Sequence, residues 1–170
     1  MIGAMNKNSS LAALGEYAAN VARSKDADEA FRYAEQVAGE LIGHRLFTIM
    51  QFNPGTMEVR RCYSSDGKHY PTGGRKGKKD TQWGRHVLEH GRHFIGHDAA
   101  DIRANFADYE VIESLGLGSV LNMPIRNLGQ TIGTMNLLHK AGYYQSGHVD
   151  MATIIVSALA GVLVTMNLGD

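Results

Sequence analysis

The sequence predicts one α+β domain, in which an antiparallel sheet from the middle of the chain carries long helices from both ends. Three observations predict this fold. Apolar residues recur at helical spacing near both termini, apolar segments of strand length fill the middle, and short turn motifs join these segments in pairs. The chain has 170 residues, 44% of them hydrophobic, which is enough for one core. The terminal helices should share one face of the sheet, and an irregular excursion should cover the other.

Two helices are expected ahead of the first strand. Residues 9–24 place leucine, alanine and valine three or four positions apart, which is the period of a helix face. Asp26 and Glu29 have the spacing of a capping box, and they begin a second amphipathic segment that Gly43 should end. Residues 1–8 are left out of this fold, as a disordered stretch or an added segment, and they contain no signal-peptide pattern.

Two strand pairs and a final helix complete the regular structure. Residues 44–52 are largely apolar on both faces, as in a central strand covered on both sides, and residues 57–64 return after a Pro-Gly turn. Residues 120–126 and 131–139 form the second pair around the turn sequence NLGQ. A helix then follows at residues 149–167. Its apolar part is shorter than the ~18–20 residues of a membrane span, so it should be buried or face another subunit.

A long excursion separates the two strand pairs. Residues 65–82 are rich in glycine and lysine and have no period, and a loop of this length in a compact domain is usually functional or disordered. Asp80 or Thr81 should cap the short helix that follows, and Gly91 should end it. The remaining expected elements are a short helix at residues 83–91, a short strand at residues 92–96 and one or two short helices at residues 98–116.

Charge and cysteine content limit the function classes. Formal net charge is zero, because 17 basic side chains balance 17 acidic ones, and this argues against nucleic acid and against an acidic membrane surface as partners. Cys62 is the only cysteine, which excludes an internal disulfide and a cysteine-based zinc site. A catalytic thiol would lack a resolving partner, so a half-buried strand cysteine is expected. The sequence therefore predicts a cytoplasmic protein.

The second strand pair carries a recognisable pattern of small residues, proline and glycine. Its parts are Gly118-Ser119, Met123-Pro124-Ile125, Gly129 and Ile132-Gly133-Thr134. These residues and the order of elements resemble the GAF domain family over roughly residues 11–167, with PAS-like relatives sharing the architecture. The resemblance implies a GAF-like antiparallel sheet of about six strands. It also implies a single domain over residues 1–170, as in the stand-alone bacterial members.

The resemblance also implies a role in signal transduction. Members of the family bind cyclic nucleotides, tetrapyrroles, haem or small metabolites, or have no known ligand, and their terminal helices commonly form dimers. We therefore expect a cytoplasmic, non-enzymatic sensory module that binds an anionic or nucleotide-like small molecule. It should act as a homodimer through residues 11–21 and 154–166, with a signalling protein as a candidate partner. The ligand and any cofactor stay unidentified.

In this family the ligand lies between the sheet and the excursion, so polar and aromatic residues of both segments are the candidates. Nine side chains are expected to line the pocket: Tyr63, Ser64, Tyr70, Arg75, Lys76, Trp83, His86, Ser119 and Asn122. The aromatic rings would supply flat apolar contacts, and Arg75 or Lys76 would meet an anionic group. A regular strand puts Ser119 and Asn122 on opposite faces, so one of these two should be structural.

Two alternatives stay open. The first is an enzyme on the same scaffold, with His86 as general base near Tyr63 or Asp98. The second is a dimerisation or interaction module with a vestigial pocket, which a dry, filled core beneath the excursion would favour. Residues 86–90, HVLEH, match a zinc-peptidase pattern, but the helix is short and the chain holds 8 histidines, so we expect no metal site. Asp108 and the acidic residues around it are expected on solvated helix faces.

Overall fold

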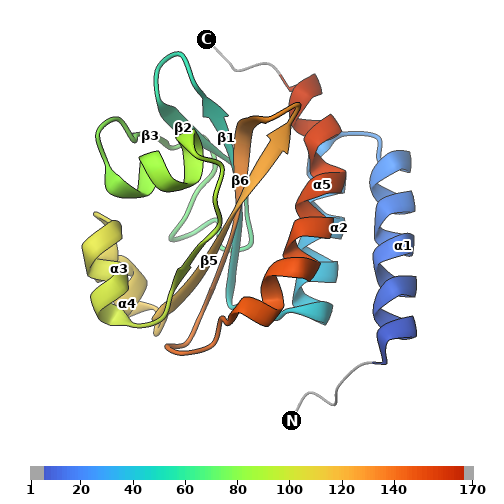
Figure 1. Cartoon of the computed structure of the whole chain (residues 1–170), viewed down its shortest axis with the longest axis horizontal. Helices are drawn as coiled ribbons and strands as arrows, with labels where there is room; N and C mark the ends of the chain where they lie inside the picture. Colours follow the sequence, from blue (N-terminus) through green and yellow to red (C-terminus); the bar gives the residue numbers. More distant parts are fainter. Residues whose placement is uncertain (1–5, 167–170) are drawn as a thin grey trace.

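A six-stranded antiparallel sheet forms the centre of the protein in the computed structural model, which describes residues 6–166 (Figure 1). The strands lie in the order β3-β2-β1-β6-β5-β4, so the two expected strand pairs meet where β1 lies beside β6. The bounds of the strands are β1 Leu46–Asn53, β2 Glu58–Ser64, β3 Arg75–Gly77, β4 Phe94–Gly96, β5 Ser119–Asn127 and β6 Gln130–His139. Two hairpins are thereby joined by one long-range pairing.

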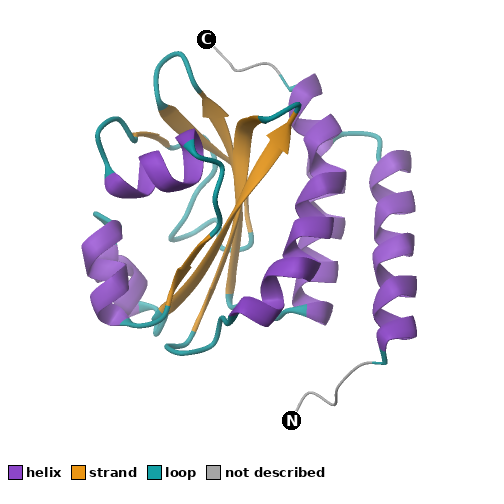
Figure 2. Cartoon of the chain, viewed as in Figure 1, coloured by secondary structure: helices purple, strands orange, loops and turns teal. Residues whose placement is uncertain are grey.

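Helices cover the two faces of the sheet in separate groups (Figure 2). The three long helices lie together on one face: α1 Lys7–Arg23, α2 Ala27–Leu41 and α5 Val149–Thr165. The other face carries the short helices of the excursion, namely the π-helix η1 Gly84–Glu89, α3 Ala99–Asn105 and α4 Tyr109–Ser114. A 3-10 turn, η2 Ser146–His148, leads into α5. The arrangement confirms the predicted α+β fold.

The ends of α2 follow the capping pattern of the sequence. The side chain of Asp26 accepts a hydrogen bond from the amide of Glu29 at 2.8 Å, and Gly43 takes up the left-handed backbone (φ 95°) just past the helix. The first helix begins earlier than expected, because the Asn6 side chain caps it and residues 7 and 8 are already helical. Residues 1–5, the rest of the stretch expected to lie outside the fold, fall outside the described residues.

Both faces of β1 are buried, as its sequence predicts. Phe47 and Ile49 pack into the core beneath the long helices, whereas Leu46 and Phe52 belong to smaller apolar clusters on the excursion side. Because successive side chains of a strand point to opposite faces, one strand contributes to both cores. The sheet therefore separates a large helix-side core from a second layer built by the excursion.

The C-terminal helix is strongly apolar. In the described part of the chain, Ser146–Thr165 is the one helix long and apolar enough by length and composition to cross a membrane, a test that core helices also pass. In this fold α5 packs on the sheet, and the carbonyl of Ile155 accepts a hydrogen bond from the hydroxyl of Tyr17 in α1 at 2.7 Å. Only 28% of the apolar window is buried, so much of the outer side of α5 is uncovered.

The excursion contains more regular structure than its sequence suggests. Residues 65–82 were expected to lack secondary structure, but β3 forms within them and pairs with β2. A three-residue edge strand is too short to show a period, which is why the pattern hides it. The short helix is present as η1, with the Thr81 hydroxyl accepting from the amide of Gly84 at 3.0 Å, and Gly91 (φ 63°) lies just past its end.

The glycines of the second strand pair have different structural roles. Leu128 and Gly129 both have positive φ, 47° and 83°, which is the geometry of a tight two-residue hairpin turn. Gly133 instead permits a close approach within β6: a Cβ there would collide with the carbonyl oxygen of Met50 in β1 and with Leu163 of α5. Its lack of a side chain therefore allows β1 and α5 to pack against the same point of β6.

We expect Gly133→Ala to lower the free energy of unfolding by about 1–3 kcal/mol, because the added methyl group overpacks the contact with Met50 and Leu163. Gly161→Ala is the matched control: Gly161 lies on the exposed side of α5 with nothing within 4 Å of a Cβ, so alanine should stabilise the helix by up to about 1 kcal/mol. Urea denaturation measures both. Equal stability of Gly133→Ala and the wild type would contradict the close approach.

Candidate functional site

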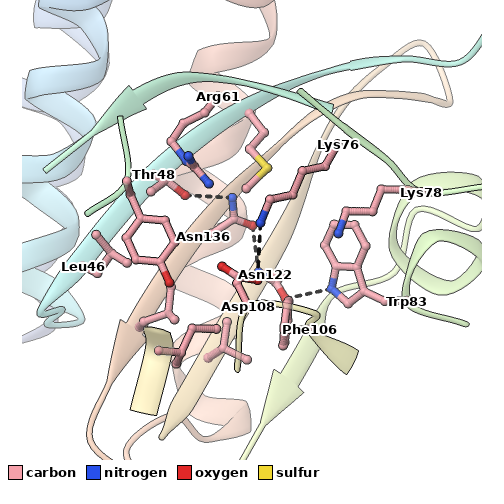
Figure 3. A pocket seen from close by; sticks show the side chains of 15 residues that line it. Leu46, Thr48, Arg61, Lys76, Lys78, Trp83, Phe106, Asp108, Asn122 and Asn136 are labelled. Atoms are coloured by element: carbon pink, nitrogen blue, oxygen red, sulfur yellow. Dashed lines mark hydrogen bonds and ion pairs between the residues drawn. The ribbon is translucent and has the colours of Figure 1, made fainter. Parts of the chain in front are cut away.

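A cavity lies between the sheet and the excursion, on the face opposite the long helices (Figure 3). Its volume is about 50 Å³. Side chains from β1, β2, β5 and β6 form its floor, and residues of the excursion form its walls. The lining residues are Leu46, Thr48, Met50, Arg61, Tyr70, Lys76, Lys78, Trp83, Phe106, Asp108, Ile112, Val120, Asn122, Asn136 and Leu138.

The floor of the cavity is crossed by a continuous chain of buried hydrogen bonds, visible in Figure 3. The indole Nε1 of Trp83 donates to Oδ1 of Asn122 at 2.9 Å, and Nδ2 of Asn122 donates to Oδ1 of Asn136 at 2.7 Å. Nδ2 of Asn136 then donates to the hydroxyls of Thr48 at 3.1 Å and Thr134 at 3.2 Å. We call these five residues the asparagine chain. It links β5, β6 and β1 to the start of η1.

Strand register explains why the two asparagines meet. Asn122 of β5 lies directly opposite Asn136 of β6, and Asn136 lies opposite Thr48 of β1. Side chains opposite one another on antiparallel strands are close enough to bond. Buried amides without partners cost ~1–3 kcal/mol each, so this pairing removes a large penalty from the centre of the sheet.

Aromatic and aliphatic groups form the walls. The ring of Phe106 makes edge contacts with the rings of Trp83 and Phe94, each with centroids 6.2 Å apart. Leu46 and Ile112 belong to an apolar cluster beside the cavity. The walls therefore offer flat apolar surface above a polar floor, which is the usual composition of a small-molecule site.

Three cationic side chains and one carboxylate reach the cavity. Nζ of Lys76 lies 3.4 Å from Oδ1 of Asp108, and Nζ of Lys78 lies 5.0 Å from the centre of the Trp83 ring. Burial, with the nearby charge of Lys76, lowers the pKa of Lys78. Asp108 was expected on a solvated helix face. It is half-buried instead, because the turn between α3 and α4 faces the sheet.

Arg61 is the most buried of these charges, with 8% of its surface exposed. One Nη donates to the carbonyl of Pro71 at 3.0 Å, and the guanidinium lies 5.0 Å from the centre of the Tyr70 ring. Its Nε and the Tyr70 hydroxyl are both buried and have no hydrogen-bond partner in the described residues. Burial lowers the pKa of Arg61 and raises the pKa of Tyr70. The nearby Asp108 carboxylate opposes the shift at Arg61 and adds to the shift at Tyr70, through its charge and through its interaction with the Tyr70 hydroxyl.

A β-bulge in β2 decides which side chains of that strand reach the cavity. Tyr63 pairs with Ile49 of β1, but the next residue of β1, Met50, pairs with Arg61, so Cys62 is an extra residue in the ladder. In a regular strand Arg61 and Tyr63 would share a face. The bulge separates them, turning Arg61 to the cavity and Tyr63 to the long helices.

Tyr63 therefore does not line the cavity, and its assignment to the pocket is wrong. Its hydroxyl donates to the carboxylate of Glu35 in α2, and its ring contacts Phe31 and Phe47 in the helix-side core. Cys62 also packs on this core and is half-buried, as expected, and burial raises the pKa of its thiol. Neither residue is placed to act on a molecule in the cavity.

Of the nine expected pocket residues, four line the cavity: Tyr70, Lys76, Trp83 and Asn122. Ser64 and Arg75 do not. The hydroxyl of Ser64 accepts from the amide of Asp66 and stabilises the turn after β2. Arg75 is exposed on β3, whose alternation turns the neighbouring Lys76 toward the cavity instead.

Ser119 is also outside the cavity, for the reason that strand alternation predicts. It points to the face opposite Asn122, where its hydroxyl donates to the carbonyl of Gly96 at 2.9 Å and accepts from the amide of Tyr144 at 3.1 Å. Ser119 thus fastens β4 and the loop before α5 to the sheet. Of the two candidates on β5, Asn122 faces the cavity and Ser119 is structural.

His86 lies away from the cavity on the outer side of η1. Its Nε2 is 2.9 Å from the carbonyl oxygen of His93, and its ring makes an edge contact with Phe94. Asp98, one expected partner, caps α3 by accepting from the amide of Asp101. The geometry that a general base requires is therefore missing at His86. Within residues 6–166, no group of three or more His, Cys, Asp or Glu is arranged to hold a metal ion.

Several cavity residues were not among the candidates. Thr48 and Asn136 could have been found. Each is a polar strand residue that alternation places on the same face of the sheet as Asn122. Arg61 could not, because the bulge changes its face. Asp108 depends on how the helices of the excursion fold back over the sheet, which no local pattern gives.

Comparison with known proteins agrees with this architecture. A sequence model of the GAF domain family matches residues 26–163. No curated protein matches the chain. The GAF domain of an Acinetobacter phosphoenolpyruvate-protein phosphotransferase superposes with a TM-score of 0.76 at 12% identity, covering 94% of this chain and 95% of that one.

Two further solved structures show the same fold. The GAF domain of a phosphoenolpyruvate-protein phosphotransferase from Coxiella burnetii has a TM-score of 0.73 at 15% identity, covering 94% of this chain and 95% of that one. The GAF domain of a two-component sensor histidine kinase from Bacillus halodurans has a TM-score of 0.65 at 12% identity, with 79% and 90% covered. At these identities the likeness concerns the fold alone.

We expect Asn122→Ala to lower the free energy of unfolding by about 2–4 kcal/mol, because it leaves the Trp83 indole N–H and Oδ1 of Asn136 buried without partners. Asn8→Ala, at an exposed position of α1, should change stability by less than about 0.5 kcal/mol. Thermal and urea unfolding, followed by circular dichroism, compare the two variants. A small effect of Asn122→Ala would mean that the asparagine chain does not hold the excursion to the sheet.

Proposed function

The chain belongs to the GAF domain family, and we propose that it is a non-enzymatic sensory module that binds a small molecule in the central cavity and signals as a homodimer. GAF domains are small-molecule-binding sensory and regulatory modules. We also propose a cytoplasmic setting, which the single free cysteine supports.

The observation that carries the proposal is the contrast between the floor and the walls of the cavity. The asparagine chain is hydrogen-bonded from end to end, whereas Nε of Arg61 and the hydroxyl of Tyr70 are buried beside the same cavity without partners. A buried donor without an acceptor costs ~1–3 kcal/mol. A vestigial pocket would have no reason to keep two such donors, whereas a ligand would supply their acceptors.

The size of the cavity implies movement of its roof. A volume of about 50 Å³ holds only a few water-sized groups, so a larger ligand needs residues 66–82 to move outward. Backbone hydrogen bonds between β3 and β2 hold part of this segment, so the side chains at the rim of the cavity would move first. The Lys76–Asp108 ion pair is partly exposed, and such pairs contribute at most ~1 kcal/mol. Opening of this rim and its closure over a ligand would be the signal.

An enzyme on this scaffold has weaker support. The catalytic hypothesis needs His86 within hydrogen-bond reach of both the cavity and an orienting carboxylate, and His86 contacts neither. The thiol of Cys62 lies on the other face of the sheet and has a raised pKa, which disfavours the nucleophilic thiolate. These positions favour binding over catalysis.

The uncovered side of the long helices supports the homodimer. Ile154 and Val164 of α5 are 50% and 57% exposed, and Leu11 of α1 is 70% exposed. α1 lies outermost, and α5 lies between it and the sheet with part of its surface uncovered (Figure 1). Apolar groups spread over adjoining helices are typical of protein interfaces, and a second copy of the same chain would cover them with a matching surface.

Ligand binding should be detectable in a thermal-shift screen against cyclic nucleotides, purines and small carboxylates. A ligand at 100 times its Kd adds about 2.7 kcal/mol to the free energy of unfolding, which raises Tm measurably. The chain has a single tryptophan, so its fluorescence reports the cavity wall directly.

Val120→Phe, which fills the cavity, should abolish both signals, and Val111→Phe, on the exposed side of α4, should keep them. Circular dichroism shows that each variant is folded. If no compound in a broad library changes Tm or Trp83 fluorescence, the pocket is vestigial and the interaction-module alternative is correct.

Light scattering after size exclusion should give twice the chain mass of 18.5 kDa for the wild type. Ile154→Glu and Val164→Glu should each shift the mass to one chain, because an interface would have to bury an unpaired carboxylate. Leu128→Glu, at the 97% exposed tip of the β5–β6 hairpin, should leave the mass unchanged. A wild-type mass of one chain across the micromolar range would contradict the dimer.

A further inference from the structure

We propose that the cavity selects an oxyanion, a carboxylate or a phosphate, carried on a flat apolar group, and that Arg61 is the residue that recognises it. This inference rests on the proposed ligand-binding function and specifies the chemistry of the ligand. It follows from the position of Arg61, from the balance of charge around it and from the shape of the walls.

Arg61 holds a buried charge without a carboxylate partner. In the part of the chain that the structure describes, its guanidinium donates a hydrogen bond to the carbonyl of Pro71, and no carboxylate lies within ion-pair distance of it. Arginine stays charged in proteins, and its planar group is suited to two parallel bonds with a carboxylate or phosphate. The unpartnered Nε gives this group one donor that is still free to bind.

The second unpartnered donor belongs to the same corner of the cavity. The ring of Tyr70 lies under the guanidinium, with its centre 5.0 Å from the carbon that joins the three nitrogens, and its hydroxyl is buried. The Asp108 carboxylate interacts with this hydroxyl without a hydrogen bond of good geometry, and an oxyanion placed beside Arg61 would replace it there and accept from both donors. A neutral amide could accept from them too, but it would leave the buried charge uncompensated.

The surrounding charges favour the same ligand. Lys76 and Lys78 add two cations to the lining, and Asp108 is the only carboxylate among the lining residues. Asp108 forms its ion pair with Lys76 rather than with Arg61. An oxyanion would correct this excess of positive charge, and Asp108 would repel it and compete with it for Lys76.

The walls indicate what carries the oxyanion. Trp83 and Phe106, which contact each other, and Tyr70 beside Arg61 present rings to the cavity, and Ile112 and Leu138 present aliphatic groups. A flat apolar body between these side chains would place its charged end toward Arg61. Aromatic carboxylates and aryl phosphates share this chemistry.

Two matched pairs of probes test the inference: benzoate against benzamide, and phenyl phosphate against phenol. Within each pair the ring is the same and only one member carries the oxyanion. Titration followed by Trp83 fluorescence and calorimetry should show at least one anion binding at least about 10-fold more tightly than its neutral partner.

Variants identify the residue responsible. Arg61→Gln should weaken binding of the anion by roughly 30-fold or more, because a buried charge partner is lost. Arg60→Gln is the matched control: it removes the same charge from the next residue of β2, on the face where Arg60 bonds to Gln51, and should change binding less than about 3-fold. Asp108→Asn should tighten binding of the anion, since it removes the competing carboxylate.

If Arg61→Gln does not fold, Arg61→Lys serves instead, because it keeps the charge but lacks Nε and should give a smaller loss. Equal binding of the members of both pairs overturns the oxyanion inference and leaves the proposed function intact. Binding that does not depend on Arg61 overturns the assigned residue and with it the inference. Failure of all four probes to bind also overturns it, and the library screen then decides separately whether the cavity binds any ligand.

Discussion

The cavity side of this protein depends on one constraint: amides and hydroxyls placed in the middle of a sheet must find hydrogen-bond partners there. Asn122 and Asn136 satisfy each other across β5 and β6, and Thr48 and Thr134 accept the two remaining bonds from Asn136. The chain of bonds ends at a residue from outside the sheet, the indole of Trp83. The hydrogen bonds that satisfy the buried polar groups of the floor therefore also fix the start of η1 and the adjoining wall of the cavity.

One face of the sheet carries the main apolar core, and the opposite face carries the candidate binding cavity. The helix face is filled with apolar side chains, and Gly133 removes the side chain that would separate β6 from β1 and α5. The opposite face has a polar floor, a charged rim with the partly exposed Lys76–Asp108 ion pair, and a roof that includes β3. Because the central strands contribute side chains to both layers, a change in the floor is felt by the residues beneath the long helices. The cavity floor and the helix layer thus share the central strands and lie on opposite sides of them.

The sequence by itself determined most of the elements, and of the cavity floor it identified Asn122. The signals that predicted these elements are local, since each affects only the few residues around it. They are the helical spacing, the Asp26 cap, the helix end at Gly43 and the NLGQ turn. Strand alternation separated Asn122 from Ser119 correctly, because a regular strand fixes the faces of its residues whatever lies beside it. Trp83, Tyr70 and Lys76 were expected at the cavity because the resemblance to the GAF family places the ligand between the sheet and the excursion.

Only the tertiary structure decided which charges enter the cavity. The extra residue Cys62 puts Arg61 and Tyr63 on opposite faces of the sheet. This bulge is set by the pairing of β2 with β1 and not by the composition of β2. The same holds for Asp108, which reaches the rim because α3 and α4 fold back over the sheet, and for β3, which exists only through its pairing with β2. Register and the packing of distant segments are long-range properties, so local periods could not predict that Arg61 and Asp108 reach the cavity.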